Sequence, residues 1–336
     1  MNHIALFAGL GGFIFATREL KIETLLANEL DAHCCKFLRD NFPKTHILEK
    51  GIESVEKSDL EQISEEVDLL TAGFPCQSFS SAGGKSIKAF DDTRGQLFFE
   101  IPKFIKNLKY PPKVVLLENV PNLKIYDNGS LLKIVLTKMR LAGYWVSDKN
   151  TAVLSSAEYG GSPQDRKRLF VVCTHRDYFK SNSFDFSTVK QQIRKDLFSI
   201  VGKETDVDKS HYLSAENKYH KMIDKLAEKH GKKRLFQIRR IEARACPTNT
   251  CPTLTANMGS GGHNVPFTYD KRGLRKLTIN ECLRLQGFEP KKMDLNGNIP
   301  LHEIKKMIGN AVNVDTVQNI ISQIQKQLLT NTLSTI

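Results

Sequence analysis

Residues 4–29 read IALFAGLGGFIFATRELKIETLLANE, and the order of patterns in this stretch decides the fold. Ile4–Phe7 is a short apolar run that predicts a strand, and the glycines that follow it predict a tight turn. Phe13–Leu20 has helical spacing, and Thr24–Ala27 predicts a second strand that ends before Glu29. A strand, a turn, a helix and a strand in this order are typical of a βαβ unit with parallel strands.

The alternation of short apolar runs and amphipathic stretches continues to about residue 176. The spacing of apolar residues predicts further helices over 32–41, 96–108 and 130–142. It predicts further strands over 46–48, 67–72, 114–117, 145–153 and 169–174. This order predicts an α/β fold with a mostly parallel sheet and helices on both faces, in which ligands bind at the carboxyl ends of the strands. A last helix over 315–329 is expected to pack back on this first domain.

The chain carries a formal net charge of +12 over 336 residues, and half of that charge falls in one segment. Residues 181–250 contain 15 lysines and arginines against 9 acidic residues, and their apolar pattern is irregular. We therefore predict a first domain over 1–180, a smaller one over 181–285, and a C-terminal segment over 286–336 that returns to the first. The basic segment favours a nucleic-acid partner, because phosphates attract it, although a generic basic surface explains the charge equally well.

The seven cysteines show no pattern of a disulfide framework or a metal site. No Cys-x-x-Cys pair occurs, and Cys246 and Cys251 lack partners at zinc-finger spacing, so we expect no metal. The N-terminus lacks a basic segment before an apolar run, and no apolar stretch has the length of a membrane span. These features predict a cytoplasmic protein in which most of the cysteines are small core residues.

Two features at the ends of the first two strands predict a nucleotide-like ligand. Gly9–Gly12 follow the first strand, where glycine lets the backbone approach a ligand closely. Glu29 stands at the end of the second strand, where a carboxylate accepts hydrogen bonds from a ribose. The pattern fits NAD, FAD or S-adenosylmethionine, and a tight turn without a ligand is the alternative.

Two reactive side chains follow the central predicted strands. Cys76 comes after Gly73-Phe74-Pro75, where a helix N-terminus or a cation would favour the thiolate. Residues 78–94 are rich in glycine, serine and threonine, and we expect them to form a closing lid. Glu118 ends the next strand, where apolar surroundings would favour a protonated carboxyl. The alternatives are a buried structural cysteine and a glutamate that caps a helix or pairs with a lysine.

The segment Gln164-Asp165-Arg166-Lys167-Arg168 precedes the last predicted strand. Alternate residues of an extended segment face the same side, so Arg166 and Arg168 are expected to point together. A guanidinium in this place is suited to hold a carbonyl oxygen of a ligand. A basic strand edge is the alternative.

Together these motifs resemble those of the DNA (cytosine-5) methyltransferases of restriction-modification systems, nearly from end to end of the chain. Phe7–Gly12 resembles the family's S-adenosylmethionine loop, and Gly73–Gln77 with Phe79-Ser80 resembles its nucleophile motif. Glu118-Asn119-Val120 and the segment from Gln164 to Arg168 resemble two further motifs. The other similar segments are Thr93-Arg94-Gly95 with Leu97-Phe98, Arg275–Thr278 with Glu281, Arg284 and Gln286–Phe288, and Gly309–Val312.

The resemblance implies a Rossmann-like sheet that binds S-adenosylmethionine, and a second, smaller DNA-recognition domain. It implies that the target cytosine is flipped out of double-stranded DNA and that Cys76 attacks C6 of its ring. Protonated Glu118 would hold N3 and the exocyclic amine, Arg168 would hold the O2 carbonyl, and Arg166 would support the site or the cofactor pocket. S-adenosylmethionine, whose product is S-adenosylhomocysteine, would be contacted by Phe7, Ala8, Gly9, Leu10, Gly11, Gly12, Glu29, Leu30, Ile52, Pro75, Leu97, Asn310, Ala311 and Val312.

The resemblance also implies partners and DNA contacts. DNA is expected to be contacted by Ser80, Lys85, Gln164, Arg239, Arg240, Arg244 and Asn257. The expected form is a monomer in the bacterial cytoplasm, associated with the nucleoid, together with a restriction endonuclease that acts on the same site. The alternatives are an RNA cytosine methyltransferase, a catalytically silent DNA-binding relative and a nicotinamide oxidoreductase.

One position departs from the family pattern. After the third strand the family usually has an aspartate that contacts the adenine amino group, whereas Lys50-Gly51-Ile52 places Gly51 there. The backbone near Ile52, or a carboxylate of Glu49 or Glu53, is expected to compensate. Leu30 is also smaller than the aromatic residue that some members carry after the glutamate.

Overall fold

The computed structural model describes residues 1–75, 97–260, 264–295 and 298–329. The chain divides into two compact units. Unit 1 comprises Met1–Leu154, Lys167–Lys190 and the chain from Val317 onward, and unit 2 comprises Ser155–Arg166 and Gln191–Thr316. The division into functional domains over 1–180, 181–285 and 286–336 stays a prediction, because the two units are defined by contacts within the chain and not by function.

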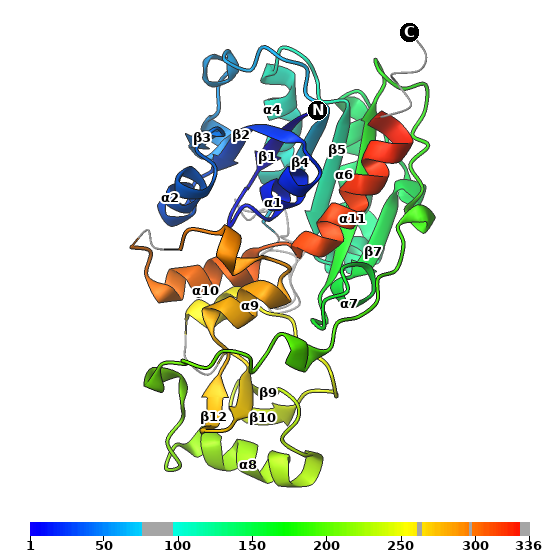
Figure 1. Ribbon diagram of the computed structural model, residues 1–336. Coiled ribbons are helices and arrows are strands. Elements are labelled where there is room, and N and C mark those ends of the chain that lie inside the picture. The colour runs from blue at the N-terminus through cyan, green and yellow to red at the C-terminus, as the bar shows by residue number, and fades with distance from the viewer. Residues whose placement is uncertain (76–96, 261–263, 296–297, 330–336) are drawn as a thin grey trace. The chain divides into compact units, whose positions relative to one another are not determined.

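An eight-stranded sheet forms the centre of unit 1 (Figure 1). Its strands lie in the order β3-β2-β1-β4-β5-β8-β6, and β7 pairs with β8. The five strands from β3 to β5 are mutually parallel, so the predicted α/β fold is confirmed. The strands are β1 (Asn2–Leu6), β2 (Glu23–Glu29), β3 (His46–Glu49), β4 (Leu69–Gly73), β5 (Val114–Asn119), β6 (Tyr144–Trp145), β7 (Thr151–Ser155) and β8 (Lys167–His175).

The strand β8 runs against the direction of β5 and of β6. At one end of the β5–β8 pairing, Asn119 lies opposite Leu169. The start of β8 therefore lies at the same edge of the sheet as the carboxyl end of β5. This reversal brings Arg168, the second residue of β8, to the edge where the parallel strands end.

Helices cover both faces of the sheet in unit 1. Apolar residues of α4 and α6, such as Phe104 and Val135, share one buried cluster with Leu70 of β4 and Leu117 of β5. In Figure 1, α1 and α11 lie in front of the sheet and α4 lies behind it. The helices are α1 (Gly12–Glu19), α2 (Ala32–Asn41), α4 (Glu100–Asn107), α5 (Asn122–Ile125), α6 (Ser130–Leu141) and α11 (Val314–Ile324), whose residues from Val317 belong to unit 1.

The prediction of one strand over 145–153 is wrong. The structure has two short strands there, β6 and β7, separated by a 3₁₀ turn over Asp148–Asn150. The main-chain N–H and the hydroxyl of Ser147 both donate to Asn150 Oδ1, at 3.1 and 3.0 Å, and hold the turn. The spacing of apolar residues does not reveal such a side-chain cap, because the cap depends on two polar residues three positions apart.

A four-stranded antiparallel sheet lies in unit 2, in the order β10-β9-β11-β12. This sheet packs against α8 (Lys218–His230), and the two share a small core that contains Ile223, Phe236 and Phe267. Its strands are β9 (Phe236–Arg239), β10 (Glu242–Ala245), β11 (Phe267–Asp270) and β12 (Gly273–Lys276), and the other helices of unit 2 are α7 (Ser156–Tyr159), α9 (Ile279–Leu285) and α10 (Leu301–Asn310). None of the described helices has both the length and the apolar character that crossing a membrane requires.

Arg275 lies fully buried in unit 2 between two carboxylates. Its Nη1 and Nη2 donate to the two oxygens of Glu281, both at 2.8 Å, and its Nε donates to Asp270 Oδ2 at 2.7 Å. Glu281 also accepts the N–H groups of Gly202 and Thr278. Because both members of this ion pair are out of water, removal of one charge leaves the other uncompensated.

Replacing Glu281 with glutamine is expected to destabilise the protein by about 3 kcal/mol or more, because a buried charge loses its partner. The measurement is the midpoint of urea unfolding, followed by circular dichroism. The matched control is Glu204→Gln, which breaks the more exposed pair of Glu204 with Arg284. That control is expected to cost less than about 1 kcal/mol. Equal shifts of the unfolding midpoint in the two variants would show that the buried ion pair contributes no more to stability than the exposed one.

Candidate active site

The glycine-rich loop after β1 is tied to the end of β2. The Gly9 N–H donates to Glu29 Oε2 at 2.8 Å, and Glu29 Oε1 accepts the next two main-chain N–H groups, at 2.8 and 2.9 Å. Gly9 and Gly11 have φ angles of 53° and 73°. A Cβ atom on Gly11 would also lie 2.9 Å from the Phe42 ring, so this turn requires glycine. The loop therefore stays close to the Glu29 carboxylate.

These residues fit a nucleoside ligand such as that of S-adenosylmethionine. Glu29 Oε2 accepts one hydrogen bond, of 2.8 Å from the Gly9 N–H, and a carboxylate oxygen has room for a second, from a ribose hydroxyl. The side chains of Ala8 and Leu10 are buried, so a ligand at this loop would meet its backbone. Leu30, directly after Glu29, exposes an apolar side chain. Together they provide acceptors for hydroxyl groups and an apolar surface for a flat ring.

The other residues predicted to contact the cofactor lie in both units. Phe7 is half-buried before the loop, Gly12 begins α1, and Ile52 is buried in a 3₁₀ turn after β3. Pro75 follows β4, and Leu97 begins the 3₁₀ turn Leu97–Phe99. Asn310, Ala311 and Val312 lie at the end of α10 in unit 2, where Asn310 is exposed.

An ion pair joins the end of β5 to the start of β8. The Arg168 Nε atom lies 3.0 Å from Glu118 Oε1, and the two side chains are 19% and 10% exposed. The end of β4 is close as well, because a Cβ atom on Gly73 would lie 3.3 Å from Glu118 Oε2. The structure thus brings together two of the predicted catalytic side chains at the edge where the parallel strands end.

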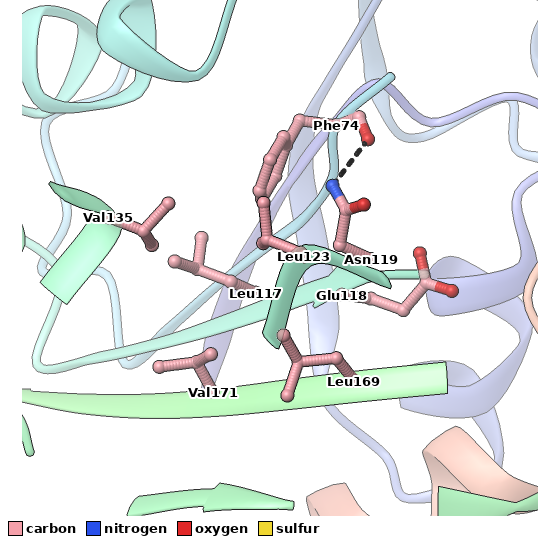
Figure 2. Close-up of a pocket in the computed structure, with 8 residues that line it drawn as sticks. All are labelled: Phe74, Leu117, Glu118, Asn119, Leu123, Val135, Leu169 and Val171. Carbon is pink, nitrogen blue, oxygen red and sulfur yellow. Dashed lines mark hydrogen bonds between the residues drawn. The ribbon is translucent and has the colours of Figure 1, made fainter. Parts of the chain in front are cut away.

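The surroundings of Glu118 are apolar on one side and charged on the other. Figure 2 shows the pocket beside it, lined by Phe74, Leu117, Asn119, Leu123, Val135, Leu169 and Val171. The sequence predicted apolar surroundings that favour a protonated carboxyl. On the other side the Arg168 guanidinium faces the Glu118 carboxyl group, and a protonated Glu118 stays a prediction.

Asn119, next to Glu118, ties β5 to the segment that leads to residue 76. Its Nδ2 donates to the Phe74 carbonyl oxygen at 3.1 Å, and its Oδ1 accepts the Val120 N–H at 2.8 Å (Figure 2). Sequence reasoning gave Asn119 no role of its own. The available signal was a polar residue at the buried end of an apolar strand, since Val114–Asn119 is buried at every position.

Arg166 has contacts quite different from those of Arg168. It is buried in unit 2, where Nη1 donates to the Leu254 carbonyl at 2.9 Å and Nη2 donates to the carbonyls of Gly309 and Ala311, at 3.3 and 2.6 Å. Arg166 and Arg168 thus have different partners, and the expectation that their guanidinium groups point to the same side stays a prediction. Arg166 fixes the turn that follows α10, which contains the predicted cofactor residues Asn310–Val312.

Gln164 is fully buried in the same unit. Its amide nitrogen donates to the Leu285 carbonyl and to Gln286 Oε1, each at 3.1 Å, and its Oε1 accepts the Leu254 N–H at 3.1 Å. Both N–H bonds of the amide are used in these contacts. They are the contacts of a positioning residue, and a DNA contact by Gln164 stays a prediction.

The remaining predicted DNA contacts lie on the surface of unit 2 or outside the described residues. Arg239, Arg240 and Arg244 are exposed on the hairpin of β9 and β10, and Asn257 is exposed in a 3₁₀ turn over Ala256–Gly259. Arg240 occupies the hairpin turn with a φ angle of 59°. Ser80 and Lys85, like the predicted nucleophile Cys76 and the predicted lid over 78–94, fall outside the described residues.

The six cysteines that the structure describes are all buried. Burial raises the pKa of Cys35, Cys246 and Cys282 to about 12, and it also raises the pKa of Cys173 and Cys251. A thiol with so high a pKa contributes almost no thiolate at neutral pH. In the described part of the chain no three His, Cys, Asp or Glu side chains group closely enough to hold a metal ion.

A glycine loop tied to a carboxylate, and a glutamate–arginine pair at one edge of an α/β sheet, fit an enzyme that binds a nucleotide-like ligand at the carboxyl ends of its strands. The family model of the C-5 cytosine-specific DNA methylases matches residues 1–326. The chain therefore belongs to this family, and it is a DNA (cytosine-5-)-methyltransferase, as its motifs predicted.

Named relatives agree with this assignment. The chain is 34% identical to the type II methyltransferase M.Bsp6I of Bacillus sp. (strain RFL6), with 97% of this chain and 98% of that one covered. It is 30% identical to the type II methyltransferase M.HpaII of Haemophilus parainfluenzae, over 94% and 86% of the two chains. Its fold is similar to that of the S. pombe Dnmt2 methyltransferase, with a TM-score of 0.70, 18% identity and coverage of 98% and 99%.

Proposed function

We propose that this enzyme transfers a methyl group from S-adenosylmethionine to C5 of a specific cytosine in double-stranded DNA. The observation that carries the proposal is the Glu118–Arg168 pair at the edge of the sheet. Gly73, at the end of the neighbouring strand β4, lies close to Glu118, and Cys76 follows Gly73 by three residues in the chain. A carboxyl group, a guanidinium and a thiol match the polar edge of cytosine and its electrophilic C6. The bound cofactor supplies an electrophilic methyl group.

The proposed roles of the side chains follow from the chemistry of the ring. The Cys76 thiolate forms a bond to C6, and the electrons of the C5–C6 double bond make C5 nucleophilic. Glu118 binds N3 and the exocyclic amine and delivers a proton to N3, while Arg168 donates to the O2 carbonyl. After C5 has gained the methyl group and S-adenosylhomocysteine has been left as the product, a base removes the C5 proton, the S–C6 bond breaks, and the N3 proton returns to Glu118. Both the ring and the thiolate are then restored.

A stacked cytosine cannot reach these groups, so we infer that the base is flipped out of the duplex. Unstacking costs a few kcal/mol, and phosphate contacts by a basic surface offset that cost. The exposed arginines of the β9–β10 hairpin support unit 2 as the DNA-reading part, together with Asn257 and, from the sequence, Ser80 and Lys85. By likeness to type II methyltransferases, we further propose a monomeric cytoplasmic enzyme that protects DNA from an endonuclease of the same specificity.

Methyl transfer from tritiated S-adenosylmethionine tests the proposal. Purified protein is incubated with duplex DNA and, separately, with tRNA, and the DNA product is then sequenced after bisulfite treatment. We expect label in DNA and protection of cytosine in one sequence context. Label in tRNA alone would overturn DNA as the substrate, and label in adenine would overturn the chemistry.

Removing the two hairpin charges in an Arg239→Ala/Arg240→Ala variant is expected to lower the salt dependence of DNA binding. Each lost phosphate contact reduces the slope of log K against log salt concentration by about 0.9. The measurement is fluorescence anisotropy of a labelled duplex at several salt concentrations. Lys149→Ala, an exposed cation of unit 1, is the control and should leave the slope unchanged. An unchanged slope in the double variant would place the DNA contact elsewhere.

A further inference from the structure

The segment that follows β3 is held firmly against the end of β2. The Lys50 N–H donates to the Glu29 carbonyl at 3.1 Å. The Asn28 Nδ2 atom donates to the carbonyls of Leu48 and Lys50, at 3.1 and 2.8 Å. Gly51, the next residue, is therefore fixed relative to Glu29, whose carboxylate holds the glycine loop. Any ligand on Glu29 has the Gly51 segment as its neighbour.

The Glu53 carboxylate lies over Gly51 in the space that a side chain at position 51 would fill. A Cβ atom on Gly51 would be 2.2 Å from Glu53 Oε1 and 2.9 Å from Oε2. Glu53 is exposed, and it has no hydrogen bond or ion pair with the described residues. The neighbouring carboxylate of Glu49 is engaged with Arg39 at 2.7 Å. Glu53 is thus the carboxylate that is available to a ligand at this strand end.

An apolar side chain lies at the adjacent strand end. Leu30 follows Glu29 and is 67% exposed, although it is a large hydrophobic residue. Ile52, between Gly51 and Glu53, is buried. An exposed leucine beside an available acceptor is the combination that a flat heterocycle with a polar edge requires: apolar contact for its face and hydrogen bonding for its edge.

The order of the strands decides which part of the cofactor reaches this place. The reacting groups belong to the ends of β4 and β5, the glycine loop follows β1, and Glu29 ends β2. A ligand whose methyl group points to β4 and whose ribose lies on Glu29 continues in the same direction to β3. Three strand spacings separate β4 from β3, about 14 Å, which an extended nucleoside with an amino-acid arm can span. The purine then falls at the end of β3.

We propose that Glu53 accepts a hydrogen bond from the exocyclic 6-amino group of the adenine ring, with Leu30 against the face of that ring. The inference rests on the proposed use of S-adenosylmethionine. The charged acceptor selects a purine that carries a donor at position 6. A purine with a carbonyl at that position presents an acceptor to an acceptor and is disfavoured. Glu53, two residues after Gly51, thereby supplies the acceptor that a glycine at position 51 lacks.

Isothermal titration of the whole protein with two ligands tests this assignment without a catalytic readout. The ligands are S-adenosyl-L-homocysteine and S-inosyl-L-homocysteine, which has an oxygen in place of the 6-amino group. The protein as it stands is expected to bind the adenosyl ligand at least about 10-fold more tightly, the usual weight of a hydrogen bond to a charged group. In Glu53→Gln that preference should shrink to about threefold or less, because an amide offers both a donor and an acceptor.

Two further variants make the test specific. Glu49→Gln is the matched control, since that carboxylate already pairs with Arg39, and it should keep the full preference. Leu30→Ala should weaken both ligands by a similar factor and leave their ratio unchanged. An undiminished preference in Glu53→Gln, or a loss of preference in Glu49→Gln, would overturn the assignment of Glu53. Failure of the unaltered protein to bind S-adenosyl-L-homocysteine would instead overturn the proposed function.

Discussion

Replacing Cys76 with serine is expected to lower methyl transfer to DNA by about 10⁴-fold or more, as loss of a covalent nucleophile commonly does. At neutral pH a serine hydroxyl supplies almost no alkoxide, whereas a thiol supplies thiolate and is intrinsically more nucleophilic. The six described cysteines are buried, so they do not offer a substitute nucleophile. The measurement is incorporation of tritiated methyl groups, with binding of S-adenosyl-L-homocysteine determined on the same preparation.

The control for this variant is Cys246→Ala, which removes a buried thiol of unit 2 whose pKa burial raises to about 12. It should retain activity when measured below its unfolding temperature. The Cys76→Ser protein should still bind the cofactor product, since the predicted cofactor contacts are other residues. Activity in Cys76→Ser close to that of the unaltered protein would refute the covalent mechanism.

The second large effect is expected at the Glu118–Arg168 pair. Glu118→Gln keeps the shape of the side chain but removes its charge and its ability to carry a proton to the ring. We expect kcat to fall by about 10³-fold, within the range of general acid catalysis. Arg168→Lys keeps the charge but loses the planar fork that directs two donors at once, and should also lower kcat.

The double variant tests whether these side chains act together. Because Arg168 Nε lies 3.0 Å from Glu118 Oε1, the combined loss should be smaller than the product of the separate losses. Single-turnover measurements on a duplex give the chemical step directly. If the losses in the double variant are instead multiplicative, Glu118 and Arg168 act independently.

The strands and helices of unit 1 were largely predictable, whereas the direction of β8 was not. Apolar periodicity marks Leu169–Thr174 as a strand but carries no information about its direction. The antiparallel pairing with β5 depends on the route of the chain through Ser155–Arg166, which belongs to unit 2. That direction is what puts Arg168 opposite Glu118, so the sequence predicted the pair as site residues without predicting their contact.

The roles of Gln164 and Arg166 illustrate a second limit. Polar and basic side chains beside a strand end suggest contact with a ligand, and the sequence offers no measure of their burial. In the structure both are buried and donate hydrogen bonds to carbonyl groups more than 80 residues away in the chain. Contacts over such separations follow from tertiary packing, which local spacing does not encode.

The helix α11 has a consequence for how the chain is made. Its residues Val317, Ile320, Ile321 and Ile324 are fully buried in unit 1, and Gln325 beyond it reaches the side chain of Met1. The strands at the start of unit 1 are therefore made long before α11, which is one of their packing partners. At about 5–20 residues per second, an apolar face of the nascent sheet stays open for roughly 15 to 65 seconds. Ribosome stalling before codon 317 should therefore yield chains that bind chaperones or are degraded.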